Sequence, residues 1–438
     1  MFYVHMLLLL AVIFIGIRYG GVAFGLFGGL GVSIMAFVFG IAPGSPPVTV
    51  MLIILAVVAA SATLEATGGL KLLVKFAEKL LRKHPDHIVF LGPLCTYFLT
   101  VLVGTGHSVY PLLPVIYDVA YKKGIRPERP MAIATVASQM GITASPIAAA
   151  AAVVIATSME NGLELSLISI LLVTIPATLT GVLVACAWSL KRGKDLDKDP
   201  EFQARLQDPE FRASLVDADA QSPSEDGKDP TASRGLTVFL LGILMVILVA
   251  MFGDVLLPEK VGMSKAIQFL MLAVGGVILL VTNIDPKKIV TSNVFTAGMT
   301  AVVIIFGIAW LSDTIIGHHK SYLVSQISDM VNLYPWSFAI AMFVVSAFLK
   351  SQAAVLTIML PLGFSLGIPP YVLIGVLPAC YAYFFFPFYP SDLAAISFDR
   401  TGTTRIGKYI LNHSFLIPGF IGVTVATVTG YFISMAIN

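Results

Sequence analysis

The sequence predicts an all-α polytopic membrane protein with two inverted repeats, each made of five membrane crossings and one re-entrant hairpin. The 438 residues are 57% hydrophobic and only 12% charged, whereas soluble domains carry about 25% charged residues. Apolar stretches also recur at lengths close to the roughly 20 residues that a crossing requires. Proline positions in the first half recur in order in the second. Together these observations exclude a soluble enzyme.

Eight segments are apolar enough to span the membrane. The first of them lacks the basic start and the small-residue cleavage site of a signal peptide, so we interpret it as a span. The predicted spans are 4–17, 22–41, 50–64, 165–190, 236–252, 267–281, 294–311 and 415–437. Segments 70–83 and, more weakly, 322–331 have the apolar and polar faces of helices that lie on a membrane surface.

Two longer apolar regions are interrupted by glycine, proline and polar residues, and each is predicted to hold a hairpin followed by a broken helix. The linker between the halves has eight basic and eleven acidic residues and is predicted to be a solvated cytoplasmic segment, mobile or locally helical, without chemistry. The predicted organisation is an N-terminal repeat 1–190 (hairpin 88–122, broken helix 130–158), the linker 191–234 and a C-terminal repeat 235–438 (hairpin 336–367, broken helix 371–398).

The two halves are related in sequence and opposite in orientation. Pro85, Pro114, Pro130 and Pro176 recur as Pro335, Pro361, Pro378 and Pro418, at offsets of 242 to 250 residues. Five crossings per half is an odd number, so the second repeat is inverted. This topology places 23 of the 27 basic residues on one side of the membrane. Because basic loops stay in the cytoplasm, we expect both termini to be periplasmic.

The four interruptions are the expected site, because non-helical backbone at membrane depth occurs where protein or a water-filled cavity satisfies its polar groups. Each interruption precedes a helix start. We expect Ser145 to be an N-cap with Pro146 at the first helical position, and Ser351, Ser391 with Asp392, and Ser108 to cap the other three helices. Each helix N-terminus favours an anion by roughly 0.3–2 kcal/mol. Two inverted pairs of such ends suit a dicarboxylate.

Several side chains at these interruptions have two interpretations. Lys350 is expensive inside a membrane; it either pairs with a substrate carboxylate or reaches the interface or Asp392. His107 either packs the tip of the first hairpin or handles a ligand or proton, and Asp392 either couples a cation or caps a helix. The predicted substrate-binding residues are Thr105, Gly106, His107, Ser108, Thr143, Ser145, Pro146, Lys350, Ser351, Gln352, Pro390, Ser391 and Asp392. No catalytic residue, metal ligand or cofactor is predicted.

Other features of the chain have mainly structural interpretations. The three cysteines, Cys95, Cys186 and Cys380, are far apart in apolar segments and are expected to be free thiols. Gly21, Gly25 and Gly29 form a stripe that favours close packing of helices within the chain or, alternatively, in a dimer. An intramembrane enzyme would need a paired catalytic group, but the adjacent His107 and Ser108 point in different directions.

Nine segments together resemble the anaerobic four-carbon dicarboxylate transporter family (Dcu) along nearly the whole chain. They are VAASATLEATGGL, AEKLLRKHP, GTGHSVYPLLPVIYDVA, IRPERPMA, QMGITASPIAAA, GKDLDKDPEFQ, SQAA, YPSDLAAISFDRTGTTRIGK and NHSFLIPG. The GKDLDKD and SDLAAISFDRTGTT stretches are more similar to the type B branch than to type A.

The resemblance implies a bacterial inner-membrane antiporter that takes up fumarate, malate or aspartate in exchange for succinate by alternating access. It also implies a mobile transport domain on a fixed scaffold, as in elevator-type transporters, a homodimer, and a sensor kinase as partner near Asp399 and Thr401. No nucleic-acid partner is expected. The alternative is a Na⁺- or H⁺-coupled symporter on the same fold, with Asp392 as the coupling acid.

Overall fold

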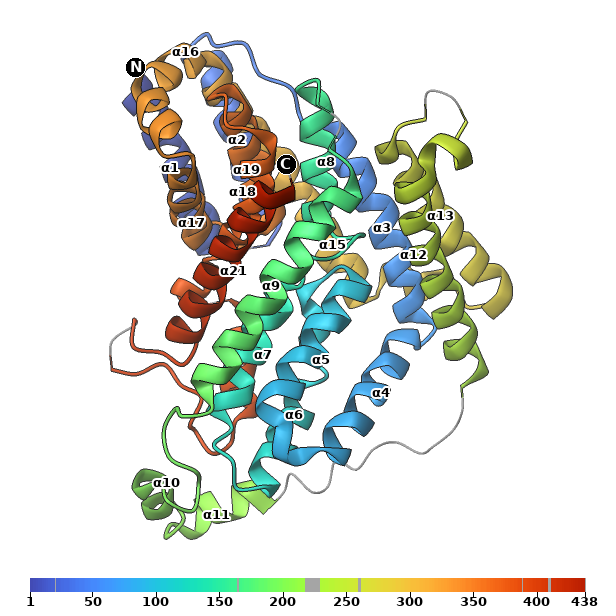
Figure 1. Ribbon diagram of the computed structural model, residues 1–438, viewed down its shortest axis with the longest axis vertical. Helices are drawn as coiled ribbons and strands as arrows, with labels where there is room; N and C mark the ends of the chain where they lie inside the picture. Colours follow the sequence, from blue (N-terminus) through green and yellow to red (C-terminus); the bar gives the residue numbers. More distant parts are fainter. Residues whose placement is uncertain are drawn as a thin grey trace.

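The protein is an all-helical membrane protein, as the sequence predicts. A computed structural model describes residues 1–19, 21–163, 165–216, 229–258, 261–387, 389–408 and 411–437. Within these ranges the regular structure is helical, apart from one isolated bridge between Ile406 and His413 (Figure 1).

The first half and the linker contain eleven α-helices in the described ranges. They are α1 (Phe2–Tyr19), α2 (Ala23–Phe37), α3 (Val48–Ala66), α4 (Gly69–Lys83), α5 (Ile88–Val103), α6 (Leu113–Lys122), α7 (Glu128–Met140), α8 (Ala149–Glu160), α9 (Leu167–Ser189), α10 (Pro200–Arg205) and α11 (Pro209–Val216).

The second half continues with ten further α-helices in its described ranges. They are α12 (Pro230–Leu256), α13 (Met263–Thr282), α14 (Lys287–Val290), α15 (Asn293–Ile304), α16 (Trp310–Leu333), α17 (Phe338–Phe348), α18 (Gln352–Ser365), α19 (Pro370–Gly375), α20 (Pro390–Phe398) and α21 (Leu416–Ile437). A π-helical turn, Ile305–Ala309, joins α15 to α16.

Seven helices in the described part of the chain are long and apolar enough to cross a membrane. Six of them overlap with predicted spans, and the other two predicted spans, 4–17 and 22–41, overlap with the shorter apolar helices Phe2–Gly16 and Ala23–Phe37. Two differences emerge. Pro85–Val103 has the length and composition of a span by itself, although the sequence suggests only one arm of a hairpin there. Segment 322–331 is continuous with α16 rather than a separate helix, and it follows the end of the candidate span Asn293–His319.

Four interruptions separate helices that succeed one another in the chain. A bend with the 3₁₀ turn Gly106–Val109 lies between α5 and α6, and residues 141–148 separate α7 from α8. In the second half, a short break precedes α18. A longer irregular segment with two 3₁₀ turns, Leu377–Cys380 and Tyr383–Phe385, precedes α20.

Glycines on α2 allow it to pack closely on the junction of α15 and the π-helical turn. A Cβ atom added to Gly25 would lie 2.0 Å from the Val303 carbonyl oxygen, and one added to Gly28 would lie 2.3 Å from the Gly307 carbonyl carbon. Gly25 therefore packs within the chain. Gly29, in contrast, has no heavy atom within 4 Å of such a Cβ, and Gly21 precedes the helix. The predicted stripe is thus wrong at Gly21 and Gly29, because the contact uses Gly28.

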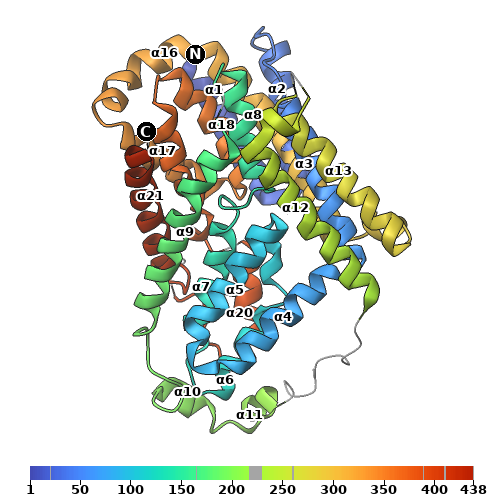
Figure 2. The ribbon, with the colours of Figure 1, turned by 45° about the vertical axis from the view of Figure 1, so that its right-hand side comes forward.

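Helices α9 and α21, which carry the matched Pro176 and Pro418, pack against each other. The contact is closest at Gly181, where an added Cβ would lie 2.2 Å from the Gly422 carbonyl oxygen. Helix α7 packs between α5 and α9, and each of its 13 residues is buried. Both views place the start of α1 and the end of α21 toward one end of the molecule, and α10 and α11 at the other (Figures 1 and 2).

Adjacent glycines on α2 provide a test of this packing. Gly28→Ala would push α2 away from Gly307, and overpacking of this kind destabilises by about 1–3 kcal/mol. Gly29→Ala has open space and gains only helix propensity, about 1 kcal/mol. We expect the apparent melting temperature of the detergent-solubilised protein to fall for the first variant and to hold or rise for the second. Equal melting temperatures would contradict the close contact.

Candidate functional site

The four interruptions meet at one cavity of about 630 Å³. Residues of α3 and α15 also line it, together with Gly16 of α1, Phe24 of α2 and Gly21 between them. The polar residues of the lining are Ser61, Thr105, His107, Asn293, Thr296, Thr300, Lys350, Ser351, Gln352, Tyr383 and Tyr389. Segments more than 200 residues apart in the chain are therefore brought to a common space, as the sequence analysis expects.

At the first hairpin tip, Thr105 is the capping residue. Its Oγ1 atom accepts a hydrogen bond from the His107 backbone N–H at 3.3 Å and contacts His107 Nδ1 at 3.1 Å. The predicted cap, Ser108, is wrong, because its hydroxyl is hydrogen-bonded to Thr100 Oγ1 at 2.9 Å on the preceding helix. Thr105 and His107 line the cavity, whereas Gly106 and Ser108 lie behind them.

At the second tip, the predicted cap is confirmed. Ser351 Oγ accepts a hydrogen bond from Ala354 N at 3.3 Å, and α18 begins at the next residue, Gln352. The first N–H groups of a helix have no partner within it. Gln352 and Ala353, which carry two of these groups, line the cavity together with Lys350 and Ser351.

At the first break, Ser145 and Pro146 are not the predicted cap and first helical residue. Helix α8 begins at Ala149, after Ala148, which makes no side-chain cap. The Ser145 hydroxyl donates to the Val101 carbonyl oxygen at 2.8 Å, one of the last carbonyls of α5 that lack a helical partner. Thr143 is buried, and its hydroxyl donates to the Met140 carbonyl oxygen.

At the second break, the predicted cap by Ser391 and Asp392 is also wrong. Helix α20 begins at Pro390, so both residues lie in its first turn. A proline suits this first position because its φ angle is already helical. Asp392 is 2% exposed. In the part of the chain that the structure describes, the buried Ser391 hydroxyl has no hydrogen-bond partner.

The structure thus divides the predicted site residues into two groups. Six of them line the cavity: Thr105, His107, Lys350, Ser351, Gln352 and Pro390. The others, Gly106, Ser108, Thr143, Ser145, Pro146, Ser391 and Asp392, lie outside its lining.

Sequence reasoning missed polar lining residues from two regions. Tyr383 and Tyr389 belong to the aromatic run YAYFFFPFYP, which is unusual inside a broken helix. Asn293, Thr296 and Thr300 of α15 recur at helical spacing in an otherwise apolar span, a periodicity that indicates one polar face.

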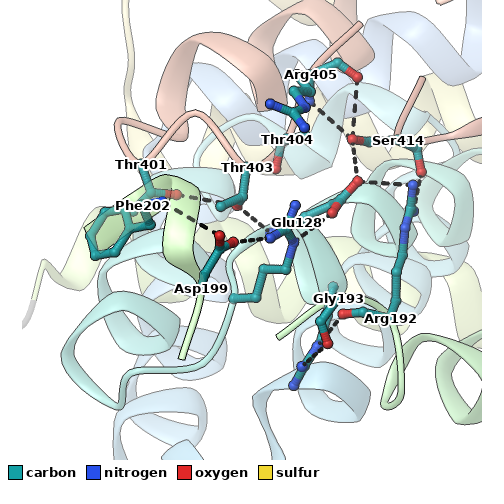
Figure 3. Close-up of polar contacts among 12 residues, drawn as sticks. Glu128, Arg192, Gly193, Asp199, Phe202, Thr401, Thr403, Thr404, Arg405 and Ser414 are labelled. Carbon is teal, nitrogen blue, oxygen red and sulfur yellow. Dashed lines mark hydrogen bonds and ion pairs between the residues drawn. The ribbon is translucent and has the colours of Figure 1, made fainter. Parts of the chain in front are cut away.

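The beginning of the linker docks on loops from both halves, contrary to the prediction of a solvated segment (Figure 3). Glu128, the first residue of α7, is the centre of the contact. Its carboxylate accepts hydrogen bonds from Arg126 Nε at 2.7 Å and from Ser414 Oγ at 2.7 Å, and pairs with Arg192 at 2.8 Å. Arg126 also pairs with Asp199 of the linker. We call Arg126, Glu128, Arg192, Asp199 and Ser414 the polar clamp.

Further contacts extend the polar clamp along the linker. Arg129 donates to the carbonyl oxygens of Arg192 and Gly193 and pairs with Asp195. The described part of the linker ends at residue 216, and the next helix, α12, begins at Pro230. The linker therefore ends before the predicted residue 234, and residues 217–228 lie outside the described ranges.

The region expected to contact a sensor kinase is folded inward. The Asp399 carboxylate accepts hydrogen bonds from Thr401, Thr403 and the Thr404 backbone N–H at 2.6 Å. Asp399 and Thr401 are 3% and 1% exposed. These two side chains stabilise their own turn and present little surface to a partner.

Comparison with known proteins gives a match along the whole chain. The family model of the anaerobic C4-dicarboxylate membrane transporters matches residues 1–438. The anaerobic C4-dicarboxylate transporter DcuB of Escherichia coli O157:H7 is 44% identical over 98% of both chains. The C4-dicarboxylate transporter DcuA of Wolinella succinogenes is 38% identical, also over 98% of both.

Two solved structures share the fold at low sequence identity. The YdaH transporter of Alcanivorax borkumensis has a TM-score of 0.58 at 15% identity, covering 88% of this chain and 85% of its own. MtrF of Neisseria gonorrhoeae has a TM-score of 0.56 at 16% identity, covering 92% and 84%. Both likenesses concern the fold alone.

Removing the central carboxylate of the polar clamp should release the linker. Glu128→Gln leaves two partly buried guanidinium groups without their shared anion, and breaking a fully buried pair costs about 3–5 kcal/mol, which is the upper limit here. We expect faster proteolytic cleavage within residues 199–212 and a lower apparent melting temperature.

The matched control is Glu201→Gln, whose pair with Arg405 is half exposed and contributes at most about 1 kcal/mol. The hydrogen bond from Arg405 lowers the pKa of the Glu201 carboxyl. The stability that this pair contributes is therefore fully present above the ordinary pKa of a glutamate. It is lost as the pH falls through the lowered pKa of Glu201. Equal protease resistance of the two variants would argue against the polar clamp.

Proposed function

We propose that this chain, which belongs to the anaerobic C4-dicarboxylate membrane transporter family, exchanges fumarate, malate or aspartate for succinate by alternating access. It is a multi-pass membrane transporter and not an enzyme, and its identity to the DcuB relative, 44%, exceeds that to the DcuA relative, 38%. One observation carries the proposal: all four interruptions line one cavity.

The charge and hydrogen-bond donors at the second tip suit a carboxylate. Lys350 supplies a positive charge, and the unpaired N–H groups at the start of α18 add the positive end of a 14-residue helix. A charge-assisted hydrogen bond contributes about 1.5–3 kcal/mol. His107 and Thr105 line the same cavity at the first tip, and they are the residues we propose to receive the second carboxylate of the same molecule.

The part of the lining formed by α3 and α15 offers few hydrogen-bond donors besides the Asn293 amide, which supports an elevator-type movement. A hydroxyl group has one proton to donate. Thr296 and Thr300 donate theirs to carbonyl oxygens one turn earlier on α15, and Ser61 donates to the Val103 carbonyl. The neighbouring wall residues are mostly apolar, such as Ile53 and Val57. A substrate held by the interrupted segments could therefore slide past α3 and α15 with them.

The inverted repeat and the orientation belong to the same proposal. The pairing of α9 with α21 is what a pseudo-two-fold axis between the halves would produce. Both termini lie away from α10 and α11 (Figure 2), which supports periplasmic termini and a cytoplasmic linker. A homodimer and a sensor-kinase partner rest on the family resemblance alone.

Exchange can be separated from cation-coupled symport, for which the buried Asp392 is the candidate acid. Proteoliposomes loaded with succinate should take up labelled fumarate without any sodium or proton gradient, and empty liposomes should not. Uptake into empty liposomes that requires an imposed cation gradient would favour the symporter. Competition by unlabelled dicarboxylates and monocarboxylates then ranks the substrates.

The tip residues can be tested in the same assay. Ser351→Ala removes the cap of α18, a loss of about 0.5–2 kcal/mol, so KM should rise about 2- to 30-fold. Lys350→Gln should raise it about 10- to 150-fold, because a charge-assisted bond is lost. The control is Ser166→Ala, which removes an equivalent cap from α9, outside the cavity lining. Wild-type KM in both tip variants would remove this cavity as the binding site.

The orientation has its own test. Alkaline phosphatase fused after residue 437 should be active, because that enzyme folds only in the periplasm. Fusion within the linker, after residue 216, should give an inactive phosphatase. The reverse pattern would invert the topology.

A further inference from the structure

We infer that Gln139 is a positioning residue that holds the two hairpin tips and the second break in one fixed arrangement around the cavity. The inference rests on the proposed function for its effect on affinity, but its structural part is independent of the substrate. Gln139 is the second-last residue of α7 and is only 1% exposed. It does not line the cavity.

The first contact of Gln139 is with the first hairpin tip. Its side-chain amide lies flat against Gly106, where an added Cβ would be 2.3 Å from Nε2 and 2.7 Å from Oε1. Gly106 stands between Thr105 and His107, the two cavity residues of that tip. The amide therefore sets how closely this tip approaches α7, and only glycine leaves room for it.

The second and third contacts join Gln139 to the other half. Tyr383 Oη donates to Gln139 Oε1 at 2.6 Å, and Gln352 Nε2 donates to the Gln139 backbone carbonyl at 2.7 Å. Gln352 Nε2 also lies 3.4 Å from Tyr383 Oη, which closes a ring of three residues. All three side chains are buried.

This ring connects a residue behind the cavity with two that line it. Gln352 is the first residue of α18. The position of Gln352 therefore affects where the first N–H groups of that helix lie. Tyr383 lies at 4.5 Å, ring to ring, from Tyr389, another lining residue. Without the Gln139 side-chain acceptor, the buried Tyr383 hydroxyl has no hydrogen-bond acceptor there. This penalty favours rotation of the tyrosine side chain, which would release Gln352.

The chain provides its own reporter of this arrangement. Cys380 is fully buried, and its Sγ atom lies 3.8 Å from Gln352 Oε1. Cys186, equally buried on α9, serves as the reference thiol. In Gln139→Met, which keeps the side-chain length without the amide, N-ethylmaleimide should modify Cys380 at least about tenfold faster relative to Cys186. Peptide mass spectrometry measures both rates without any substrate.

Transport kinetics separate positioning from general stability. Gln139→Met and Tyr383→Phe should each raise the KM for fumarate about 5- to 150-fold, corresponding to about 1–3 kcal/mol. The double variant should show the same KM as either single variant, because both remove one bond. Its melting temperature should recover, because no polar group is left unpaired. If Gln139 mattered only for stability, the double variant would regain affinity for fumarate together with its melting temperature.

Tyr97→Phe is the matched control, because it removes another buried tyrosine hydroxyl, bonded to Thr178 at 2.8 Å between α5 and α9. It should leave KM and Cys380 labelling unchanged. Unchanged KM in both ring variants, or a raised KM with Cys380 still protected, would overturn the positioning role. If the wild type shows no dicarboxylate exchange but Cys380 is labelled faster in Gln139→Met, the proposed function is contradicted. The positioning role of Gln139 is then still supported.

Discussion

Helix α7 is buried along its entire length, although it carries two charged residues and several polar ones. A polar group buried without a partner costs about 1–3 kcal/mol, and an unpaired charge costs more. The hydroxyls of Thr135 and Ser138 donate to carbonyl oxygens of α7 itself, whereas the polar groups at the two ends of the helix have partners on other segments. Glu128 bonds to the linker and to the loop after α20, and Gln139 bonds to Tyr383 and Gln352. The requirement to pair these groups fixes the positions of the segments around α7.

This requirement couples the two ends of the molecule. The polar clamp gathers at the first residue of α7, and the ring of Gln139, Tyr383 and Gln352 at its last turn. A helix of 13 residues is about 20 Å long and nearly rigid. Any displacement of the cavity-lining breaks must therefore move the polar clamp with them, and with it the docked part of the linker. The linker then belongs to the unit that includes the breaks, although its composition is that of a flexible tether.

Features that depend on composition, such as the membrane spans, could be predicted from the sequence. Features that depend on which hydrogen-bond partner a side chain finds could not. Burial in lipid requires only apolar residues, so the spans follow from hydropathy, and Gly-Pro interruptions locate the breaks. A serine near a helix start, however, can cap that helix or bond any other orphan carbonyl. Ser351 does the first, whereas Ser145 bonds Val101. The linker shows the same limit, since Asp199 pairs with Arg126, 73 residues away in the chain.

The unequal walls of the cavity bear on which part of the protein moves. On α15 the threonine hydroxyls donate along their own helix, so they hold no carboxylate in place. On the interrupted segments the donors are Lys350 and the first backbone N–H groups of α18, apart from that of Ala354, which Ser351 caps. In the proposed elevator movement, a dianion held by these donors would give up few bonds to α3 and α15, where Asn293 is the polar lining residue with an amide. It would lose its bonds to the tips if the two tips separated, so the tips must travel together, and the buried ring around Gln139 supplies the connection.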